Sequence, residues 1–181
     1  IKAGTRGDGE QGEDISHNVK TIKQIPLTLN GNNHPKKIEI RGEIYCEKTA
    51  FDKFNKEYLK TDEKTFANPR NFVAGSIRQL NPEIAASRPL KIQLHSLGYV
   101  DQENFFKSHQ EMLKTFLSWN LPINPDAKLV GSIEEVLSYC EKLTNKREAL
   151  NYEIDGVVIK IDDVSIQKEL GFSSRSPKWS I

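Results

Sequence analysis

The stretch that most constrains the fold is Ile38–Cys46, IEIRGEIYC, in which apolar and polar side chains alternate. A period of two sends successive side chains to opposite faces of a strand, so the pattern predicts one apolar and one charged face. On the charged face, Arg41 and Glu43 flank Gly42, whose missing side chain lets a ligand approach closely. Half-buried strands also carry paired charges on their solvent side, so this stretch alone supports a structural role and a binding role equally.

The length of the chain fits one folded domain, and its nearly balanced charge gives no overall indication of nucleic-acid binding. The 181 residues include 26 basic and 25 acidic side chains, for a net charge of +1, and the mean hydropathy is −0.59. No apolar run is long enough to span a bilayer. Cys46 and Cys140 lie far apart and the histidines are scattered, which argues against a disulfide scaffold or a zinc site. A reducing, cytoplasmic compartment is therefore expected.

The segment Thr5–Asp14, TRGDGEQGED, contains three glycines and is predicted to be a loop. It lacks the Gly-Lys-Ser/Thr of a Walker loop, and its acidic residues do not have EF-hand spacing. Two interpretations remain open. The segment is either an acidic surface turn or a loop on which Arg6 contacts a phosphate or sugar.

A helix is predicted within Phe66–Leu80, FANPRNFVAGSIRQL, beginning at Asn68-Pro69. Its expected buried stripe consists of Phe72, Val73, Ile77 and Leu80. Arg70 and Arg78 are about two helical turns apart, so they are expected to project in related directions. Guanidinium groups in this arrangement suit phosphates or structural carboxylates, and the residues alone slightly favour the structural role.

Three further helices are expected from their caps and periodicity. Thr49 is predicted to cap a helix that carries Phe51, Phe54 and Tyr58 on one side. Another helix follows Ser108, and a third follows the capping box of Ser132 and Glu135. The last two helices are interpreted as scaffold.

Two more strands are expected. Leu90–Val100 alternates, and it places His95 opposite Leu94, where the ring could stack on a base or simply pack. Tyr152–Ile161, YEIDGVVIKI, is β-branched and apolar, yet it includes Asp155 and Lys160. Charged groups in such a run are expensive to bury unless they are paired or face a cleft.

Five motifs occur in order along the chain: TRGDGxxGED, IEIRGE, FANPRNxxAGSxRQL, DGVVIK and LGFxxRxPKW. Together they resemble the adenylation domain of bacterial NAD-dependent DNA ligases over essentially the whole chain. Related nucleotidyltransferases share RGE or DGVVIK, whereas FANPRN, AGSxRQL and the TRGDG loop are more specific. The resemblance implies an α+β fold of antiparallel sheets with flanking helices. The implied fold is that of the DNA ligase/nucleotidyltransferase (ATP-grasp-like) adenylation domain, which is expected to be incomplete over residues 1–181.

The resemblance also implies a reaction in three steps. A lysine attacks the AMP phosphorus of NAD and expels nicotinamide mononucleotide, and the AMP then passes to the 5′-phosphate of a DNA nick. The 3′-hydroxyl finally displaces AMP and seals the strand. Mg²⁺ is expected to assist, and Zn²⁺ is expected only outside this chain. The implied partners are nicked double-stranded DNA and NAD or AMP, with the protein acting as a monomer.

The same resemblance implies binding or catalytic roles for seven residues of this chain. Arg6 would contact the nucleotide, Glu43 the sugar hydroxyls of adenosine, and Lys160 the α-phosphate. His95 stands where the family often has a tyrosine stacked on adenine. Asp155 would support a metal or the reactive lysine, with Glu43 as a second candidate magnesium ligand. Arg70 and Arg78 would engage phosphates or the nicked DNA. Glu43, His95 and Lys160 are expected to line one pocket.

The sequence departs from the family at the nucleophile. No Lys-x-Asp-Gly occurs in the 181 residues, and Lys60-Thr61-Asp62-Glu63 lacks the glycine. The chain is expected to start after this motif and to end before a further lysine, so the chain alone is predicted to be inactive.

Two other readings remain. One is a non-catalytic nucleotide- or DNA-binding relative of the nucleotidyltransferases. The other is an RNA ligase or capping enzyme, which FANPRN and AGSxRQL disfavour. The choice of NAD over ATP rests on the resemblance alone.

Overall fold

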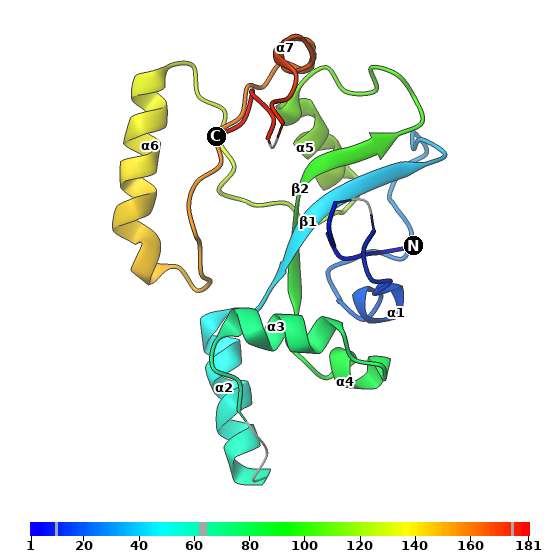
Figure 1. The fold of residues 1–181 in the computed structure, drawn as a ribbon, viewed down its shortest axis with the longest axis vertical. Helices are drawn as coiled ribbons and strands as arrows, with labels where there is room; N and C mark the ends of the chain where they lie inside the picture. The colour runs from blue at the N-terminus through cyan, green and yellow to red at the C-terminus, as the bar shows by residue number, and fades with distance from the viewer. Residues whose placement is uncertain (10, 62–64, 175) are drawn as a thin grey trace. The chain divides into compact units, whose positions relative to one another are not determined.

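A computed structural model describes residues 1–9, 11–61, 65–174 and 176–181 (Figure 1). Its helices are α1 (Ser16–Val19), α2 (Lys48–Tyr58), α3 (Pro69–Ile77), α4 (Pro82–Ala86), α5 (His109–Ser118), α6 (Ile133–Lys146) and α7 (Val164–Leu170), with 3₁₀ turns η1 (Leu59–Thr61) and η2 (Arg147–Ala149). Strands β1 (Ile38–Tyr45) and β2 (Lys91–Val100) pair as one antiparallel sheet. Glu10, Asp62, Glu63 and Arg175 of the quoted motifs lie outside the described residues.

The helix and strand content agrees with the expected α+β class, although the described residues form one two-stranded sheet rather than several. They divide into two compact units. Unit 1 comprises Ile1–Leu29 and Glu43–Gln93, and unit 2 comprises Asn30–Gly42 and Leu94–Ile181. The division falls within both strands, so β1 and β2 each contribute residues to both units. Among the described helices, none is long and apolar enough to cross a membrane.

The alternation predicted for Ile38–Cys46 is visible in β1. Ile38 and Ile40 are half-buried, Glu39 and Arg41 are exposed, and Cys46 after the strand is only 2% exposed. Burial raises the pKa of the Cys46 thiol to about 11, which makes it an inert packing residue. Arg41 Nε lies 3.0 Å from Glu39 Oε1 on the charged face, so this part of the strand carries the solvent-side charge pair of the structural interpretation.

The core of unit 1 is built around Phe72 of α3, which is fully buried. Its ring lies 5.8, 4.7 and 5.1 Å from those of Phe51, Phe54 and Phe66. The predicted start of α3 is confirmed, because Asn68 Oδ1 accepts from the backbone N–H of Asn71 and Pro69 follows at the first helical position.

Two details of unit 1 differ from the expectations. The N-cap of α2 is Glu47, not Thr49, and the helix therefore begins two residues earlier than a Thr49 cap would allow. Leu80 is fully exposed rather than buried, because α3 ends at Ile77 and the helical stripe does not continue to residue 80.

The core of unit 2 gathers around α5, whose Met112 and Phe116 are buried. The predicted helix start at Ser108 is confirmed, and Ser108 Oγ caps the helix by accepting from the backbone N–H of Glu111 at 3.0 Å. The chain after α5 returns to the sheet, because Leu94 N donates to Pro122 O at 2.8 Å. Further buried residues are Leu94, Phe106, Trp119 and Leu121.

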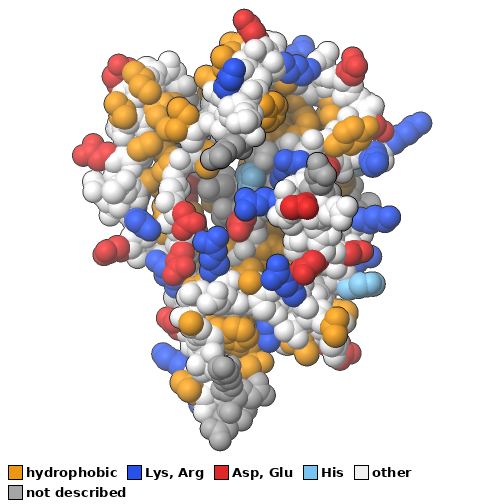
Figure 2. All heavy atoms as spheres, viewed as in Figure 1, with side chains coloured by type: hydrophobic (Ala, Val, Ile, Leu, Met, Phe, Trp, Pro, Cys, Tyr) orange, Lys and Arg blue, Asp and Glu red, His pale blue; other side chains and the backbone are white. Residues whose placement is uncertain are grey.

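Helix α6 starts at the predicted Ser132 cap, where Ser132 Oγ accepts from the backbone N–H of Glu135. Its interpretation as scaffold stays a prediction, and no residue of α6 is buried. Ile133 and Leu137 are each 62% exposed. Figure 2 accordingly shows hydrophobic side chains at the surface of this helix.

The third predicted strand, Tyr152–Ile161, is wrong as a regular element: only an isolated bridge at Lys160 is present. Ile159 and Ile181 exchange backbone hydrogen bonds of 2.9 and 3.0 Å, and Ile161 N donates to Trp179 O at 3.0 Å. A β-strand needs a partner along its length, and this pairing is confined to the last residues of the segment.

Candidate functional site

The glycine-rich segment forms a closed loop in unit 1. Gly4 and Asp14 form an antiparallel bridge, Thr5 N donates to Glu13 O at 3.0 Å, and Glu13 N donates to Thr5 Oγ1 at 3.0 Å. A Cβ on Gly12 would lie 1.9 Å from Thr5 O, so only glycine fits where the two arms of the loop meet. The loop is therefore an exposed turn with a defined backbone, and the role of Arg6 on it stays a prediction.

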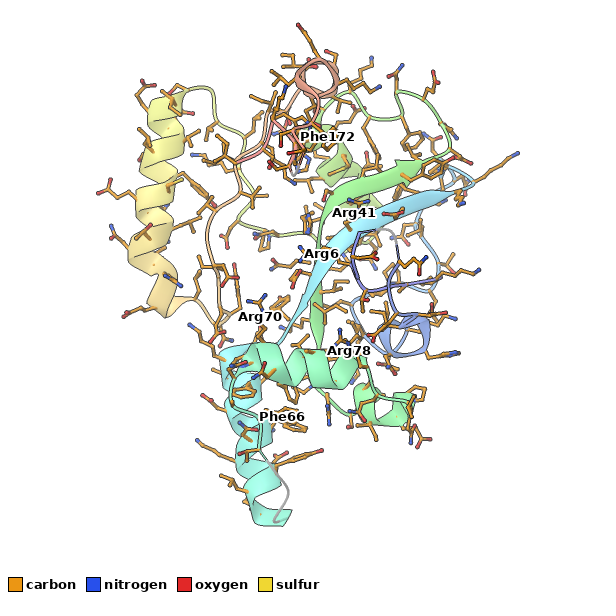
Figure 3. All side chains as sticks on the ribbon, viewed as in Figure 1. Arg6, Arg41, Phe66, Arg70, Arg78 and Phe172 are labelled. Carbon is orange, nitrogen blue, oxygen red and sulfur yellow. The ribbon has the colours of Figure 1, made fainter. Side chains whose placement is uncertain are left out.

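Arg6 and Arg78, which are both labelled in Figure 3, line the same open hollow. Thr5, Gly7, Gln11, Gly12 and Glu13 complete its lining. Arg78 Nε lies 2.7 Å from Glu13 Oε2, and both side chains are more than half exposed. Two guanidinium groups that line one hollow form a surface suited to anionic oxygen atoms.

Arg70 and Arg78 lie at opposite ends of α3 in Figure 3. Arg70 is an exposed residue of the first helical turn. Arg78 is the C-cap, with φ −100° and ψ 12°, and so lies outside the helical repeat. The related directions inferred from two helical turns do not apply, because the helix ends before Arg78.

Lys160 and His95 come together in unit 2. Lys160 Nζ lies 3.4 Å from the backbone carbonyl oxygen of His95. Desolvation lowers the pKa of Lys160, since burial penalises the charged ammonium. An anion bound beside Lys160 would compensate for this lost hydration, so the position favours a phosphate.

The His95 ring is held by Ser96, whose Oγ lies 2.7 Å from Nδ1. Desolvation lowers the pKa of His95, and the positive charges of Lys160 and Arg41 lower it further. The ring is therefore neutral at pH 7, and a neutral aromatic ring can stack on a nucleobase.

Sequence reasoning missed His109, the first residue of α5. Its backbone N–H donates to Asp162 O at 2.8 Å, and Gln110 N donates to Asp162 Oδ1 at 2.7 Å. Desolvation, with the charge of Lys160 second, lowers the pKa of His109 to about 4. The position of His109 at the start of the helix predicted after Ser108 was the only sequence cue, and it does not indicate burial.

Glu43 and Asp155, the two candidate magnesium ligands, are both exposed. Glu43 belongs to unit 1, whereas Asp155, His95 and Lys160 belong to unit 2. The single pocket expected for Glu43, His95 and Lys160 thus stays a prediction. Among the described residues, no group of three or more His, Cys, Asp or Glu side chains is arranged to hold a metal ion.

The structure therefore presents two local arrangements that suit a phosphorylated ligand. One is the hollow of Arg6 and Arg78 in unit 1, and the other is the Lys160–His95 pair in unit 2. Charge neutralisation and positioning are the main requirements of nucleotidyl transfer, and arginine and lysine supply both.

Residues 1–181 match the family model of the NAD-dependent DNA ligase adenylation domain. The chain therefore belongs to this family, as its motifs predict. It is 46% identical over all 181 residues to two proteins named DNA ligase, from Coxiella burnetii strains Dugway 5J108-111 and RSA 331 / Henzerling II. The chain spans 27% of the length of each of these relatives.

Proposed function

We propose that this chain is the nucleotide-binding part of an NAD-dependent DNA ligase that seals 5′-phosphate/3′-hydroxyl nicks in duplex DNA. The observation that carries the proposal is the family match over residues 1–181. The local chemistry of Lys160 and of the Arg6–Arg78 hollow supports it, because both arrangements favour anionic oxygen atoms. The proposed setting is replication and repair in the cytoplasm, with the protein acting as a monomer.

In this proposal the AMP group of NAD is bound by the residues that the family resemblance names. Lys160 neutralises the α-phosphate, the neutral His95 ring stacks on adenine, and Glu43 accepts hydrogen bonds from the ribose hydroxyls. Arg6 contacts the nucleotide from its loop. Charge-assisted contacts of this kind contribute about 1.5–3 kcal/mol each.

Arg70 and Arg78 are proposed to contact phosphates of the nicked DNA. Phosphate contacts fix the register of a protein on a duplex and make binding dependent on salt. The exposure of Arg70 and the hollow beside Arg78 leave room for such contacts.

Metal ions are part of the proposal only as expectations from the family. Glu43 and Asp155 stay candidate magnesium ligands, and zinc is assigned to no residue of this chain. The roles proposed for the other site residues of this chain are binding, orientation and charge neutralisation.

The nucleophile is proposed to lie outside the 181 residues, because they contain no Lys-x-Asp-Gly. Incubation of the 181-residue chain with NAD and Mg²⁺ should therefore give no mass increase corresponding to AMP. A robust covalent adduct would show that the nucleophile is one of the lysines present here.

The function is tested on the full-length gene product with a nicked duplex and either NAD or ATP. Sealing with NAD, accompanied by release of nicotinamide mononucleotide, is expected. Sealing with ATP alone would disprove the choice of cofactor. Binding of AMP without sealing by either nucleotide would instead favour the non-catalytic binding relative.

A further inference from the structure

Arg78 is held from two directions by residues of the N-terminal segment of unit 1. Glu13 contacts its guanidinium, with Nε and Oε2 2.7 Å apart. Asn18 of α1 contacts the backbone on either side of Arg78: its Nδ2 donates to Ile77 O and to Gln79 O, each at 2.7 Å. The two acceptors are the carbonyl groups of the residues directly before and after Arg78.

Asn18 occupies this place at an energetic cost. Its side chain is only 4% exposed, and Oδ1 has no hydrogen-bond partner among the described residues. A buried polar atom without a partner is destabilising, so such atoms are uncommon in native structures. The Asn18 amide therefore donates two hydrogen bonds at the end of α3 while its own Oδ1 accepts none from the described residues.

The two Asn18 contacts restrain a point where the backbone has no helical support. Arg78 is the C-cap of α3, with dihedral angles outside the helix, and the last carbonyl groups of a helix lack intrahelical partners. Because the Asn18 amide donates to the carbonyl groups on both sides of Arg78, it restrains the backbone there and so the direction of the Arg78 side chain. In Figure 2 basic and acidic side chains adjoin over the end of α3.

We propose that Asn18 is a positioning residue for Arg78, which it orients through the flanking carbonyl groups so that the guanidinium faces the hollow beside the Thr5–Asp14 loop. Glu13 completes the arrangement by accepting from Nε, and the guanidinium carries four further N–H donors for a phosphate. The exposed Glu13–Arg78 ion pair adds little to stability, so its main effect is on geometry. The inference rests on the proposed function, in which Arg78 contacts a DNA phosphate.

The test measures binding of the full-length gene product to a nicked duplex as a function of salt. Arg78→Ala should reduce the slope of log K against log [salt] by about one, the value for one lost phosphate contact. Asn18→Ala should reduce the slope in the same direction. The double variant Asn18→Ala/Arg78→Ala should bind no more weakly than Arg78→Ala alone, because Asn18 acts through Arg78.

Asn81→Ala is the matched control. Asn81 lies in the same unit and caps α4, where its Oδ1 accepts from Glu83 N at 2.9 Å. Replacing Asn81 should lower the unfolding midpoint through the loss of this cap, without removing either contact of Asn18. It should leave the salt slope unchanged. Asn18→Ser is a second variant, used where circular dichroism shows that Asn18→Ala is unfolded.

The outcomes separate the two proposals. An unchanged slope in Arg78→Ala would refute the phosphate contact of Arg78, and with it this part of the proposed function. A reduced slope in Arg78→Ala together with an Asn18 variant that behaves like Asn81→Ala would overturn the positioning role alone. Loss of the fold in both Asn18 variants would assign Asn18 to stability and would also overturn it.

Discussion

The ammonium group of Lys160 lies 3.4 Å from the backbone carbonyl oxygen of His95 and is partly desolvated, which lowers the pKa of Lys160. A phosphate beside this group would restore the charge interactions that burial removes. The pair joins the DGVVIK motif to strand β2 within unit 2, at the position where we propose that a phosphate binds.

Replacing Lys160 by alanine should weaken AMP binding by the full-length gene product by about 1.5–3 kcal/mol, the range for a hydrogen bond to a charged group. Isothermal titration calorimetry with AMP measures the change. Lys168→Ala is the matched control, since Lys168 lies in α7 and bonds Asn104 Oδ1 at 2.7 Å. Equal affinity of the Lys160 variant and the unmodified protein would remove Lys160 from the site.

Glu43→Ala should also weaken AMP binding by about 1.5–3 kcal/mol, because a carboxylate that accepts from ribose hydroxyls would be lost. The same titration measures the loss. Glu39→Ala, on the same strand and paired with Arg41 at 3.0 Å, should not weaken binding. If both variants bound AMP like the unmodified protein, Glu43 would be a solvent-side charge of β1.

Alanine at Gly12 should distort the glycine-rich loop. The added Cβ would lie 1.9 Å from Thr5 O, whereas a Cβ on Gly4 would keep an ordinary 3.6 Å from Glu13 O. We expect Gly12→Ala to lower the free energy of unfolding by on the order of 1–3 kcal/mol. Gly4→Ala is the control, and urea unfolding of the two variants measures the difference in their free energies of unfolding. Similar free energies for Gly12→Ala and Gly4→Ala would show that the loop accommodates a side chain at residue 12.

Stability should fall as the pH decreases from about 6.5 to about 4. Burial lowers the pKa of His109 from 6.5 to about 4, so between these values the unfolded chain binds a proton that the folded chain does not. Above pH 6.5 both states are neutral at this residue and the contribution is constant. The full shift corresponds to at most about 3 kcal/mol.

His109→Gln should therefore reduce the loss of stability over this pH range, as measured by urea unfolding at several pH values. His17→Gln replaces an exposed histidine and provides the control. A pH dependence that is the same in the His109 variant as in the unmodified protein would contradict a neutral, desolvated His109.

Phe72→Ala should lower the free energy of unfolding by about 3–5 kcal/mol, the range for removal of a buried phenylalanine. Phe72 is fully buried among three aromatic rings, and Leu80, eight residues later, is fully exposed. Leu80→Ala should change stability by less than about 0.5 kcal/mol. Thermal or urea denaturation compares the two, and a small effect at Phe72 would contradict its central place in unit 1.

The starts of several helices could be predicted from the sequence, because a cap joins residues that are close along the chain. Asn68 contacts Asn71, Ser108 contacts Glu111 and Ser132 contacts Glu135. The alternation in β1 was readable for the same reason, since it is a property of successive residues. The α2 cap was misread because Thr49 and Glu47 are both compatible with the helix pattern that follows.

The arrangements at the candidate site depend on distant residues. Arg78 forms an ion pair with Glu13, and the peptide groups on both sides of Arg78 accept from Asn18, although these residues are about sixty positions apart in the sequence. Lys160 contacts the backbone carbonyl of His95, which is 65 positions away. The sequence determined the family and the residue types that suit phosphate. Tertiary structure alone decided which charged groups are paired and which are desolvated. It also confined the backbone strand pairing of Tyr152–Ile161 to its last residues, because burial and backbone pairing are set by neighbours in space.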